Sequence, residues 1–497
     1  MTRVLILGGG LAGMLSAAAL APHVDEITIV EQDRLPDRPE ARRGLPQAAH
    51  NHMLLGGGAE AVERLLPGTL DRLYAAGAHR RSYLDSILIR TTEGWGRRHE
   101  IDAYVIACSR NLVDHVVRQQ VLQEGKVKTV EAAAVTGLTG TAARVTGARF
   151  ETGDGRTETV EADLVVDATG HRSKTPDWLV DLGLPRVEEE FVDPGFAYSR
   201  QIYEAPEGLR EDFPGVLIQP EHGTGKPGVG AALMPNEDGR WMVVMIGTRG
   251  SRPPTDQEGF LAFARGERTR VVSELIAGAR PISPVRAYND LANRRRNYHK
   301  LPAPEGFIVI GDAATRVNPT YATGMSAAAL SALVLRDHAA RGELTGAASR
   351  KVQAGIAKAT SGPWQMALSM DFWFPEVKTN VKPPGGERMM RFANRYAGVS
   401  TDKQPVGNAA FKVSALMAPA SSLMRLPLLL SVWRGSPLPP LTADQALSQY
   451  PQFVRALDEV PAVGTDDALF EGTEGEDRTE GEGRTVGEDR TVGTEKH

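Results

Sequence analysis

The amino-acid sequence predicts an α/β protein in which a domain of parallel strands is interrupted by an inserted antiparallel sheet and followed by helices. Residues 1–31 alternate short apolar runs with a helix-forming segment. Residues 196–248 contain successive strand-like runs separated by turn residues. Residues 351–435 have the composition and spacing of helices. Together these observations favour two different sheets and a helical C-terminal region.

The N-terminal segment has the order of a Rossmann-type βαβ unit. It contains an apolar run, a glycine-rich turn, helix formers, a second apolar run and an acid, namely Val4–Leu7, Gly8–Gly13, Met14–Leu20, Ile27–Val30 and Glu31. A lone G-x-G-x-x-G motif is weak evidence, but the complete ordered series is much stronger. The alternative is an ordinary βαβ unit with a glycine-rich turn.

Each residue type in this unit has a physical role in binding a dinucleotide. Gly8 permits the tight turn, Gly10 lets the backbone approach a pyrophosphate, and Gly13 lets the helix pack closely on the sheet. The helix N-terminus offers free N–H groups and a positive dipole end to phosphates. Glu31 can accept hydrogen bonds from ribose hydroxyls. The sequence therefore predicts a dinucleotide site here.

Bulk composition excludes several classes of protein. A chain of 497 residues indicates two or three domains, and its 41% hydrophobic and 24% charged residues are typical of globular proteins. The net charge of −5 gives no sign of nucleic-acid binding. The single cysteine, Cys108, excludes an internal disulfide and a multi-cysteine metal site. His50 and His52 lack a third ligand at a recognisable spacing, so we expect no metal.

The sequence also gives expectations about location. The N-terminus leads directly into a strand, so we expect no signal peptide. We expect no membrane span, because no run of about twenty uncharged apolar residues occurs. The apolar stretch 416–433 favours a lid or wall over a pocket more than an interfacial membrane helix, since its basic face is thin. A cytoplasmic enzyme is the expectation.

The predicted domain order follows from these patterns. Helices are expected over 54–77 and 256–278, and a hairpin is expected around Gly153–Gly155. The predicted parts are a nucleotide-binding domain, an inserted antiparallel substrate domain, a second part of the nucleotide-binding domain, a C-terminal helical region and a disordered acidic tail, over 1–180, 181–290, 291–345, 346–460 and 464–497.

Two further segments carry candidate site residues. Asp312 follows the buried run Ile308–Ile310, at the strand end where α/β sheets place ligand contacts, and Gly324 and Met325 open a helix. Arg110 lies in the first turn of a helix that Ser109 is expected to cap. A positive charge at that end is mildly unfavourable, so Arg110 is either a ligand contact or an exposed arginine.

Three separated pieces of the chain resemble the class A flavoprotein monooxygenases, which include para-hydroxybenzoate hydroxylase. The pieces are Gly8–Glu31, Asp163–Gly170 and Gly311–Ser326, and the resemblance covers about residues 1–340. It implies FAD as the cofactor, with Asp312 at the ribityl chain. The cofactor-binding residues implied by motif and resemblance are Gly8, Gly10, Leu11, Ala12, Gly13, Glu31, Arg43, Arg110, Asp312, Gly324 and Met325.

A closer likeness is to the flavin epoxidases of polyether antibiotic pathways. It rests on Arg42–Gln47, His50, His52, Pro67–Leu73, Asn293–Arg295, Asn318–Pro319, Tyr321 and Gly324–Ser326. It implies an apolar polyketide or terpenoid substrate in bacterial natural-product biosynthesis. The sequence departs from that subgroup in two places. Ala49 replaces a usual arginine, and Tyr321–Gly324 reads Tyr-Ala-Thr-Gly where the subgroup has Tyr-Gly-His-Gly.

The resemblance leaves alternatives for the reaction. A monooxygenase, whether epoxidase or hydroxylase, would use O2 and NAD(P)H, and its substrate is expected between the inserted sheet and the C-terminal helices. A flavoprotein that keeps FAD as a structural element and catalyses a redox-neutral cyclisation, such as a [4+2] cycloaddition, is the rival. A non-catalytic FAD-containing binding protein is the third alternative. The cofactor carries the chemistry in the first case, so the sequence designates no catalytic side chain.

Overall fold

The computed structural model describes residues 2–458, apart from residues 124, 211–212, 290, 303, 345–347 and 384. The chain divides into two units, Met1–Val460 and Pro461–His497. The second unit and the predicted disordered tail 464–497 lie outside the described residues. Within the described residues, no helix is both long enough and apolar enough to cross a membrane.

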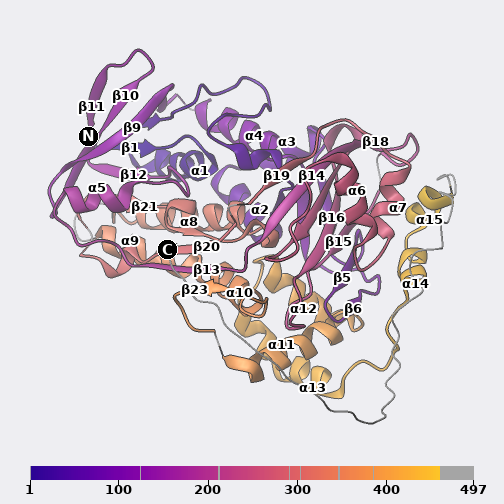
Figure 1. The fold of residues 1–497 in the computed structure, drawn as a ribbon. Coiled ribbons are helices and arrows are strands. Elements are labelled where there is room, and N and C mark those ends of the chain that lie inside the picture. Colours follow the sequence, from indigo (N-terminus) through magenta and orange to yellow (C-terminus); the bar gives the residue numbers. More distant parts are fainter. Residues whose placement is uncertain are drawn as a thin grey trace, which may run out of the picture. The chain divides into compact units, whose positions relative to one another are not determined.

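A parallel sheet forms the centre of the nucleotide-binding domain (Figure 1). Among the described residues it has five strands in the order β21-β12-β1-β2-β8, and every neighbouring pair is parallel. This order, with a βαβ unit at the N-terminus, confirms the predicted Rossmann-type fold. The strands are β1 (Arg3–Leu7), β2 (Glu26–Val30), β8 (Val127–Val130), β12 (Leu164–Asp167) and β21 (Phe307–Val309).

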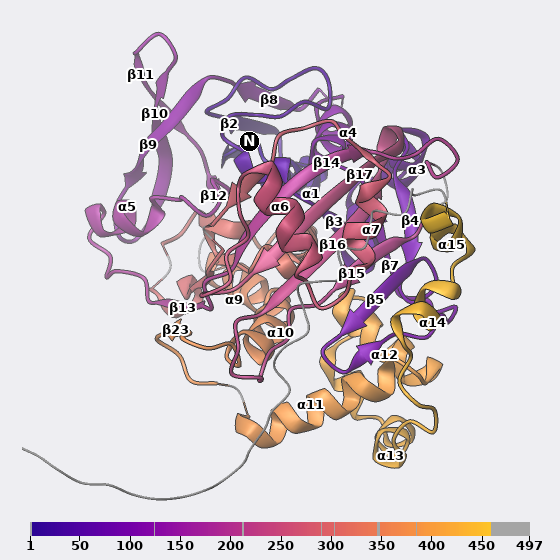
Figure 2. The same cartoon turned by 45° about the vertical axis from the view of Figure 1, so that its right-hand side comes forward.

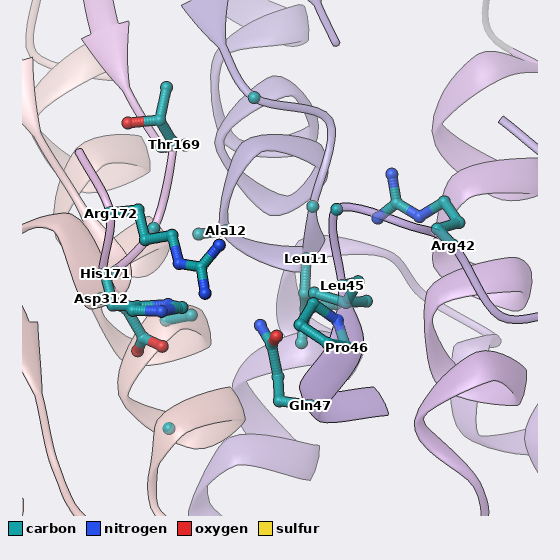
Figure 3. A pocket seen from close by; sticks show the side chains of 18 of the residues that line it. Leu11, Ala12, Arg42, Leu45, Pro46, Gln47, Thr169, His171, Arg172 and Asp312 are labelled. Atoms are coloured by element: carbon teal, nitrogen blue, oxygen red, sulfur yellow. The ribbon is translucent and has the colours of Figure 1, made fainter. Parts of the chain in front are cut away.

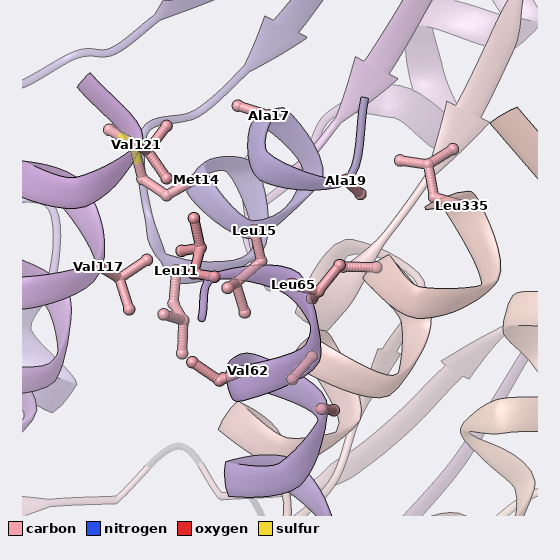
Figure 4. Close-up of a cluster of buried hydrophobic side chains, with 14 of the residues drawn as sticks. Leu11, Met14, Leu15, Ala17, Ala19, Val62, Leu65, Val117, Val121 and Leu335 are labelled. Atoms are coloured by element: carbon pink, nitrogen blue, oxygen red, sulfur yellow. The ribbon is translucent and has the colours of Figure 1, made fainter. Parts of the chain in front are cut away.

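Alternate residues of β1 enter different cores on the two faces of this sheet. Val4 and Ile6 pack among helices, whereas Leu5 and Leu7 pack against a small antiparallel sheet. Figure 4 shows the helical side, where side chains of α1 meet those of α2, α4 and α8. The covering elements are α1 (Leu11–Leu20), α2 (Gly56–Leu65), α4 (Arg110–Leu122), α8 (Gly324–Ala339) and α9 (Ala348–Ala359) on one face, and β9 (Ala133–Gly140), β10 (Val145–Thr152), β11 (Thr157–Glu161) and α5 (Thr175–Asp181) on the other.

Two predicted helices are interrupted. The segment 54–77 begins with a strand and then forms two helices, β3 (Met53–Leu55), α2 and α3 (Thr69–Ala75). Pro67 and Gly68 separate the two helices. Gly68 has a φ of 82°, which is incompatible with a right-handed helix. The segment 256–278 likewise forms α6 (Gln257–Arg265) and α7 (Val271–Ala277).

The predicted antiparallel region forms a larger, strongly twisted sheet (Figure 2). Its strand order among the described residues is β18-β14-β17-β16-β15-β5-β6, and β19 also pairs with β14. The neighbours are antiparallel except β15 and β5, which are parallel. The strands are β5 (Ile87–Thr91), β6 (Gly94–Trp95), β14 (Ala197–Glu204), β15 (Gly215–Ile218), β16 (Val229–Asn236), β17 (Arg240–Gly247), β18 (Arg280–Pro281) and β19 (Arg286–Tyr288).

This large sheet takes strands from two parts of the sequence. β5 and β6 lie within 1–180, the range assigned to the first part of the nucleotide-binding domain, whereas β14–β19 lie within the predicted insertion. One face carries Tyr203 and Trp241, which pack with α6, α7, α14 (Ala443–Ser448) and α15 (Pro451–Asp458). The opposite face carries Tyr198 and Met242. The predicted domain boundaries remain a prediction.

Two small sheets connect these parts. They are β3-β7-β4 and β22-β20-β13-β23, both antiparallel. Their remaining strands are β4 (His79–Ser82), β7 (Tyr104–Ala107), β13 (Glu189–Asp193), β20 (Asn293–Arg296), β22 (Thr315–Arg316) and β23 (Lys378–Thr379).

The C-terminal region is mainly helical, as its sequence predicts. It contains α10 (Ser361–Asp371), α11 (Gly386–Ser400), α12 (Gln404–Ser414) and α13 (Leu426–Arg434). The inner side of α13 packs through Leu428 and Val432, while Leu426, Leu430 and Trp433 lie on its exposed side.

Candidate functional site

A cavity of about 820 Å³ opens at the carboxyl ends of the parallel strands. Ten of the eleven predicted cofactor-binding residues line it, namely Gly8, Gly10, Leu11, Ala12, Glu31, Arg43, Arg110, Asp312, Gly324 and Met325. Gly13 does not line the cavity, because it packs against the turn beneath it. The structure therefore brings segments from four distant parts of the sequence to one space.

The three motif glycines meet three different steric demands. Gly8 has a φ of 101°, and a Cβ there would lie 2.6 Å from the carbonyl oxygen of Ala168. A Cβ on Gly13 would lie 1.9 Å from the carbonyl oxygen of Gly8. A Cβ on Gly10 would meet no atom within 4 Å. Gly8 and Gly13 are thus required by the fold, whereas Gly10 keeps the N-terminus of α1 open to the cavity.

Glu31 directly follows β2 and is buried beside this turn. Its Oε2 accepts a hydrogen bond from the backbone N–H of Gly9 at 2.6 Å, and its Oε1 accepts one from the N–H of Asp33 at 2.9 Å. Each oxygen keeps a further lone pair. The backbone therefore holds the carboxylate at the cavity wall, with acceptor capacity left for ribose hydroxyls.

A buried cluster of alternating charges continues from Glu31. Arg42 Nη1 lies 3.6 Å from Glu31 Oε2, and Arg42 Nη2 lies 3.8 Å from Asp114 Oδ2. Arg110 Nε donates to Asp114 Oδ1 at 2.7 Å, an i,i+4 pair on α4. Arg110 thus lines the cavity and also has an ion-pair partner. The sequence argument selected the exposed Arg43 and passed over Arg42, which turns inward.

We expect Arg42→Met to destabilise the protein by about 2–3 kcal/mol, because it leaves Glu31 and half of the Asp114 carboxylate uncompensated in a buried site. The matched variant Arg43→Met removes an exposed charge and should change stability by no more than about 0.5 kcal/mol. Urea denaturation of both variants measures the difference. Equal losses would mean that the buried cluster contributes nothing of its own.

Asp167 organises the loop that follows β12. The carboxylate is fully buried, and it accepts hydrogen bonds from Thr169 N and Oγ1 through Oδ1 and from Ser173 Oγ and Thr175 Oγ1 through Oδ2, at 2.6–2.9 Å. The same loop presents Thr169, His171 and Arg172 to the cavity, opposite Gln47 (Figure 3). Asp167 itself does not line the cavity, so its role is to shape the loop.

Asp312 lies beside the N-terminus of α8, and Figure 3 shows it across the pocket from Arg42. A Cβ on Gly324 would lie 3.9 Å from Asp312 Oδ1. Burial raises the pKa of Asp312, and the charges of Arg316 and Arg110 oppose that shift. The free N–H groups of α8 and the Asp312 carboxyl group together offer donors and acceptors to a polar ligand.

Aromatic side chains and two neutral histidines form the end of the cavity nearest the large sheet. Tyr198 and Tyr288 line it, and the Tyr288 ring lies 5.2 Å from that of His50. Burial and the nearby Arg200 lower the pKa of His50 to about 4, so its imidazole is neutral at pH 7. Burial and Arg110 lower the pKa of His52 to about 3, and its Nδ1 lies 2.8 Å from the carbonyl oxygen of His50. The two histidines therefore add no charge to this end, where Arg316 Nη2 donates to the hydroxyl of Tyr288 at 3.4 Å.

A buried polar network supports the segment between Asn318 and α8. Asp371 accepts hydrogen bonds from the hydroxyl of Tyr321 and, at 2.5 Å, from Nδ2 of Asn293. Asn293 Oδ1 accepts the N–H of Asn318 at 2.7 Å, and Asn318 Oδ1 accepts the hydroxyl of Tyr198 at 3.2 Å. Burial raises the pKa of Asp371 to about 7, although its hydrogen bonds lower it.

We expect Asp371 to make the stability of the protein fall as the pH rises from about 4 to about 7. Its pKa in the folded state lies above its ordinary value of 3.8, so the folded state binds the proton more tightly and loses that advantage through this range. Between about pH 4 and 7 the free energy of unfolding should fall by on the order of 2–4 kcal/mol. Asp371→Asn keeps the shape of the side chain and should remove this pH dependence. Urea denaturation across the pH range measures it. An unchanged slope in the variant would contradict the assignment.

The residues of the cavity fit a flavin dinucleotide. The open space at Gly10 and the α1 N-terminus suit a pyrophosphate, and Glu31 has acceptor capacity for a ribose. Asp312 and the α8 N-terminus provide polar groups at the other side. Fold and site thus define a dinucleotide-binding flavoprotein.

The chain matches the family described as FAD binding domain over residues 1–352, and it therefore belongs to that family. It is 30% identical over 400 residues to Protein Rv3254 of Mycobacterium tuberculosis, which covers 77% of this chain and 82% of that protein. The family confirms the prediction of FAD as the cofactor.

Three solved structures share the fold. They are the flavin-dependent brominase Bmp2 (TM-score 0.62, 14% identity, 83% of this chain and 94% of that one), pqsL, a probable FAD-dependent monooxygenase from Pseudomonas aeruginosa (0.55, 18%, 75% and 94%), and the Diels-Alderase PyrE3 of pyrroindomycin biosynthesis (0.55, 15%, 84% and 80%). Identities this low show a common fold alone.

The predicted place of the substrate stays a prediction. The sequence argument placed the substrate between the large sheet and the C-terminal helices. The residues that line the cavity end at Ala328, and the stretch 416–433 contributes none. The α12 side chain of Phe411 instead packs tightly with Tyr83, at a ring distance of 5.0 Å. The cavity described above reaches the large sheet on its Tyr198 side.

Proposed function

We propose that this protein is an FAD-dependent monooxygenase, an epoxidase or hydroxylase, that acts on an apolar polyketide or terpenoid intermediate of a polyether-like pathway. The observation that carries the proposal is the cavity itself. Its cofactor-binding residues continue without a break into an aromatic wall on the large sheet. When bound, FAD supplies reduction of O2 and transfer of one oxygen atom to an electron-rich carbon.

The residues of the chain would bind, orient and exclude water. Glu31, the α1 N-terminus and Asp312 would hold the dinucleotide, and Tyr198 and Tyr288 would give the substrate an apolar surface. His50 and His52 are neutral, so they can donate or accept a hydrogen bond without placing a charge beside the reacting carbon. We designate no side chain as a catalytic acid or base. NAD(P)H is the proposed reductant.

A redox-neutral cyclase is the second candidate. It is favoured by two positions that lack the polar groups of the epoxidases it resembles. Ala49 carries no polar group, and the hydroxyl of Thr323 is buried without a hydrogen-bond partner among the described residues. FAD would then be a structural part of the site. The altered residues leave the cofactor assignment unchanged.

Spectroscopy and product mass separate the two candidates. The purified protein is mixed with NADPH, first without O2 and then in air, together with a polyene substrate extract. Bleaching of the flavin, reoxidation in air and a product heavier by one oxygen atom are expected for a monooxygenase. A flavin that stays oxidised while an isomeric product forms would establish the cyclase instead.

A further inference from the structure

A second cavity of about 610 Å³ adjoins the first. The 3-10 helix Pro46–Ala49 separates them, because Pro46 and Gln47 line the first cavity while Ala48 and Ala49 line the second. About half of the residues that line the second cavity are apolar, namely Pro39, Ala41, Ala48, Ala49, Ala76, Leu112, Val116, Ile202 and Met242.

The two cavities also share one face of β14. Tyr198 lines the first cavity, and Arg200 and Ile202 line the second. Alternate residues of a strand point to the same side, so these three side chains follow one another along the wall. A ligand lying across Arg200 therefore reaches from one cavity toward the other.

Arg200 is a buried cation that has no counter-ion among the residues the structure describes. It is 5% exposed, its Nη1 donates to Ser283 Oγ at 3.1 Å, and its buried Nε has no hydrogen-bond partner within the described part of the chain. No described carboxylate lies within ion-pair distance of it. Burial and then the charge of Arg286 lower the pKa of Arg200. Burying an isolated charge lowers the stability of the fold unless a ligand of opposite charge pairs with it.

The other polar groups near Arg200 are a neutral imidazole and side chains of both charges. His50, whose pKa Arg200 helps to lower, has a buried Nδ1 with no partner among the described residues. Arg72 and Arg240 line the same cavity with exposed side chains, and Arg240 Nη2 lies 3.5 Å from Oδ2 of Asp238. Two acids also line the cavity: Glu237 accepts the N–H of Ser109 at 2.9 Å, and Asp238 pairs with Arg240.

We propose that the second cavity binds the oxyanion of an amphipathic ligand, with Arg200 holding the carboxylate or phosphate and the apolar wall holding its chain. The oxyanion belongs either to the substrate or to the nicotinamide reductant. The choice between these two ligands rests on the proposed function, whereas the oxyanion site itself does not. The guanidinium donates two hydrogen bonds in the plane that suits either group.

Thermal unfolding of the FAD-containing protein tests the proposal without turnover. The probes are octanoate, 1-octanol, inorganic phosphate and NADP+ at matched ionic strength. Octanoate or a phosphate probe should raise the Tm of the parent protein, and 1-octanol should not. In Arg200→Met the shift should vanish and the Kd for the effective probe should rise about 10–100-fold, as loss of a charge-assisted hydrogen bond implies.

A stability signature distinguishes this site from an ordinary structural arginine. Without any probe, Arg200→Met should unfold at the same temperature as the parent or a degree or two above it, because methionine fills the space without a buried charge. Arg200→Lys keeps the charge and should retain part of the shift. Arg149→Met, an exposed arginine of β10 that lines neither cavity, should retain all of it.

The outcomes decide both the proposal and the source of the oxyanion. An Arg200-dependent shift with octanoate alone assigns the carboxylate of the substrate, and one with NADP+ or phosphate alone assigns the reductant. Equal shifts in the parent and Arg200→Met, or no difference between octanoate, phosphate, NADP+ and 1-octanol, would overturn the proposal. If Arg200→Met fails to fold, the parent and Arg200→Lys still give this comparison. A failed monooxygenase assay leaves these results unchanged.

Discussion

Gly13→Ala is expected to destabilise the protein by about 3 kcal/mol or more, because the new methyl group would stand 1.9 Å from the carbonyl oxygen of Gly8. Backbone atoms on both sides of that contact are fixed by β1 and α1, so neither can yield without separating the helix from the sheet. Urea denaturation of the protein after removal of FAD measures this loss apart from cofactor binding.

Gly10→Ala is the matched control for that experiment. Its Cβ would meet no protein atom within 4 Å, so the stability of the FAD-free protein should change by no more than about 0.5 kcal/mol. The same methyl group would occupy the space through which a pyrophosphate approaches the backbone, so FAD should be lost on purification. A yellow Gly10→Ala protein, or a Gly13→Ala protein of unchanged stability, would contradict the separate roles of these glycines.

Asp167→Ala is expected to lower stability by about 4 kcal/mol. It removes the acceptor for four donors on Thr169, Ser173 and Thr175, three of them side-chain hydroxyls, and leaves those of Ser173 and Thr175 buried without it. Asp167→Asn keeps an acceptor oxygen and the shape, so it should lose about half as much. Chemical denaturation gives both values, and the FAD content of each variant reports whether the loop still lines the cavity.

Asp177→Ala is the matched control, because it removes an exposed aspartate close to Asp167 in the sequence. Asp177 lies in the first turn of the neighbouring α5 but is exposed and paired only with the exposed Arg186, so its loss should change stability by about 0.5 kcal/mol or less. If Asp167→Ala and Asp177→Ala are equally stable, the buried carboxylate does not organise the loop.

Local patterns in the sequence were sufficient for the βαβ unit and much of its site. Glycines at a fixed spacing impose steric requirements that act within a few residues, and Glu31 and Asp312 each follow an apolar run that forms a strand. The Ser109 cap was also predicted correctly, since its hydroxyl accepts the N–H of Leu112. Such features depend on neighbours in the chain.

The features that the sequence argument missed depend on distant partners. Which of Arg42 and Arg43 turns inward is decided by Glu31 and Asp114, which reach the same place only in the folded chain. The break in the helix 54–77 was signalled by Pro67 and Gly68, but the apolar spacing was given precedence. The isolation of Arg200 is a property of its surroundings from several segments, so no local motif reveals it.

The parallel pairing of β5 with β15 has a consequence for the order in which the chain folds. Residues 87–91 are synthesised long before residues 215–218, yet each supplies a strand that the other must hydrogen bond. Contacts between residues so far apart in sequence form slowly, because the entropy of closing a long loop is lost before the contact stabilises the chain. The large sheet therefore cannot be completed during early synthesis. Transplanting residues 181–290 alone would leave β5 behind, so this sheet is not a portable module.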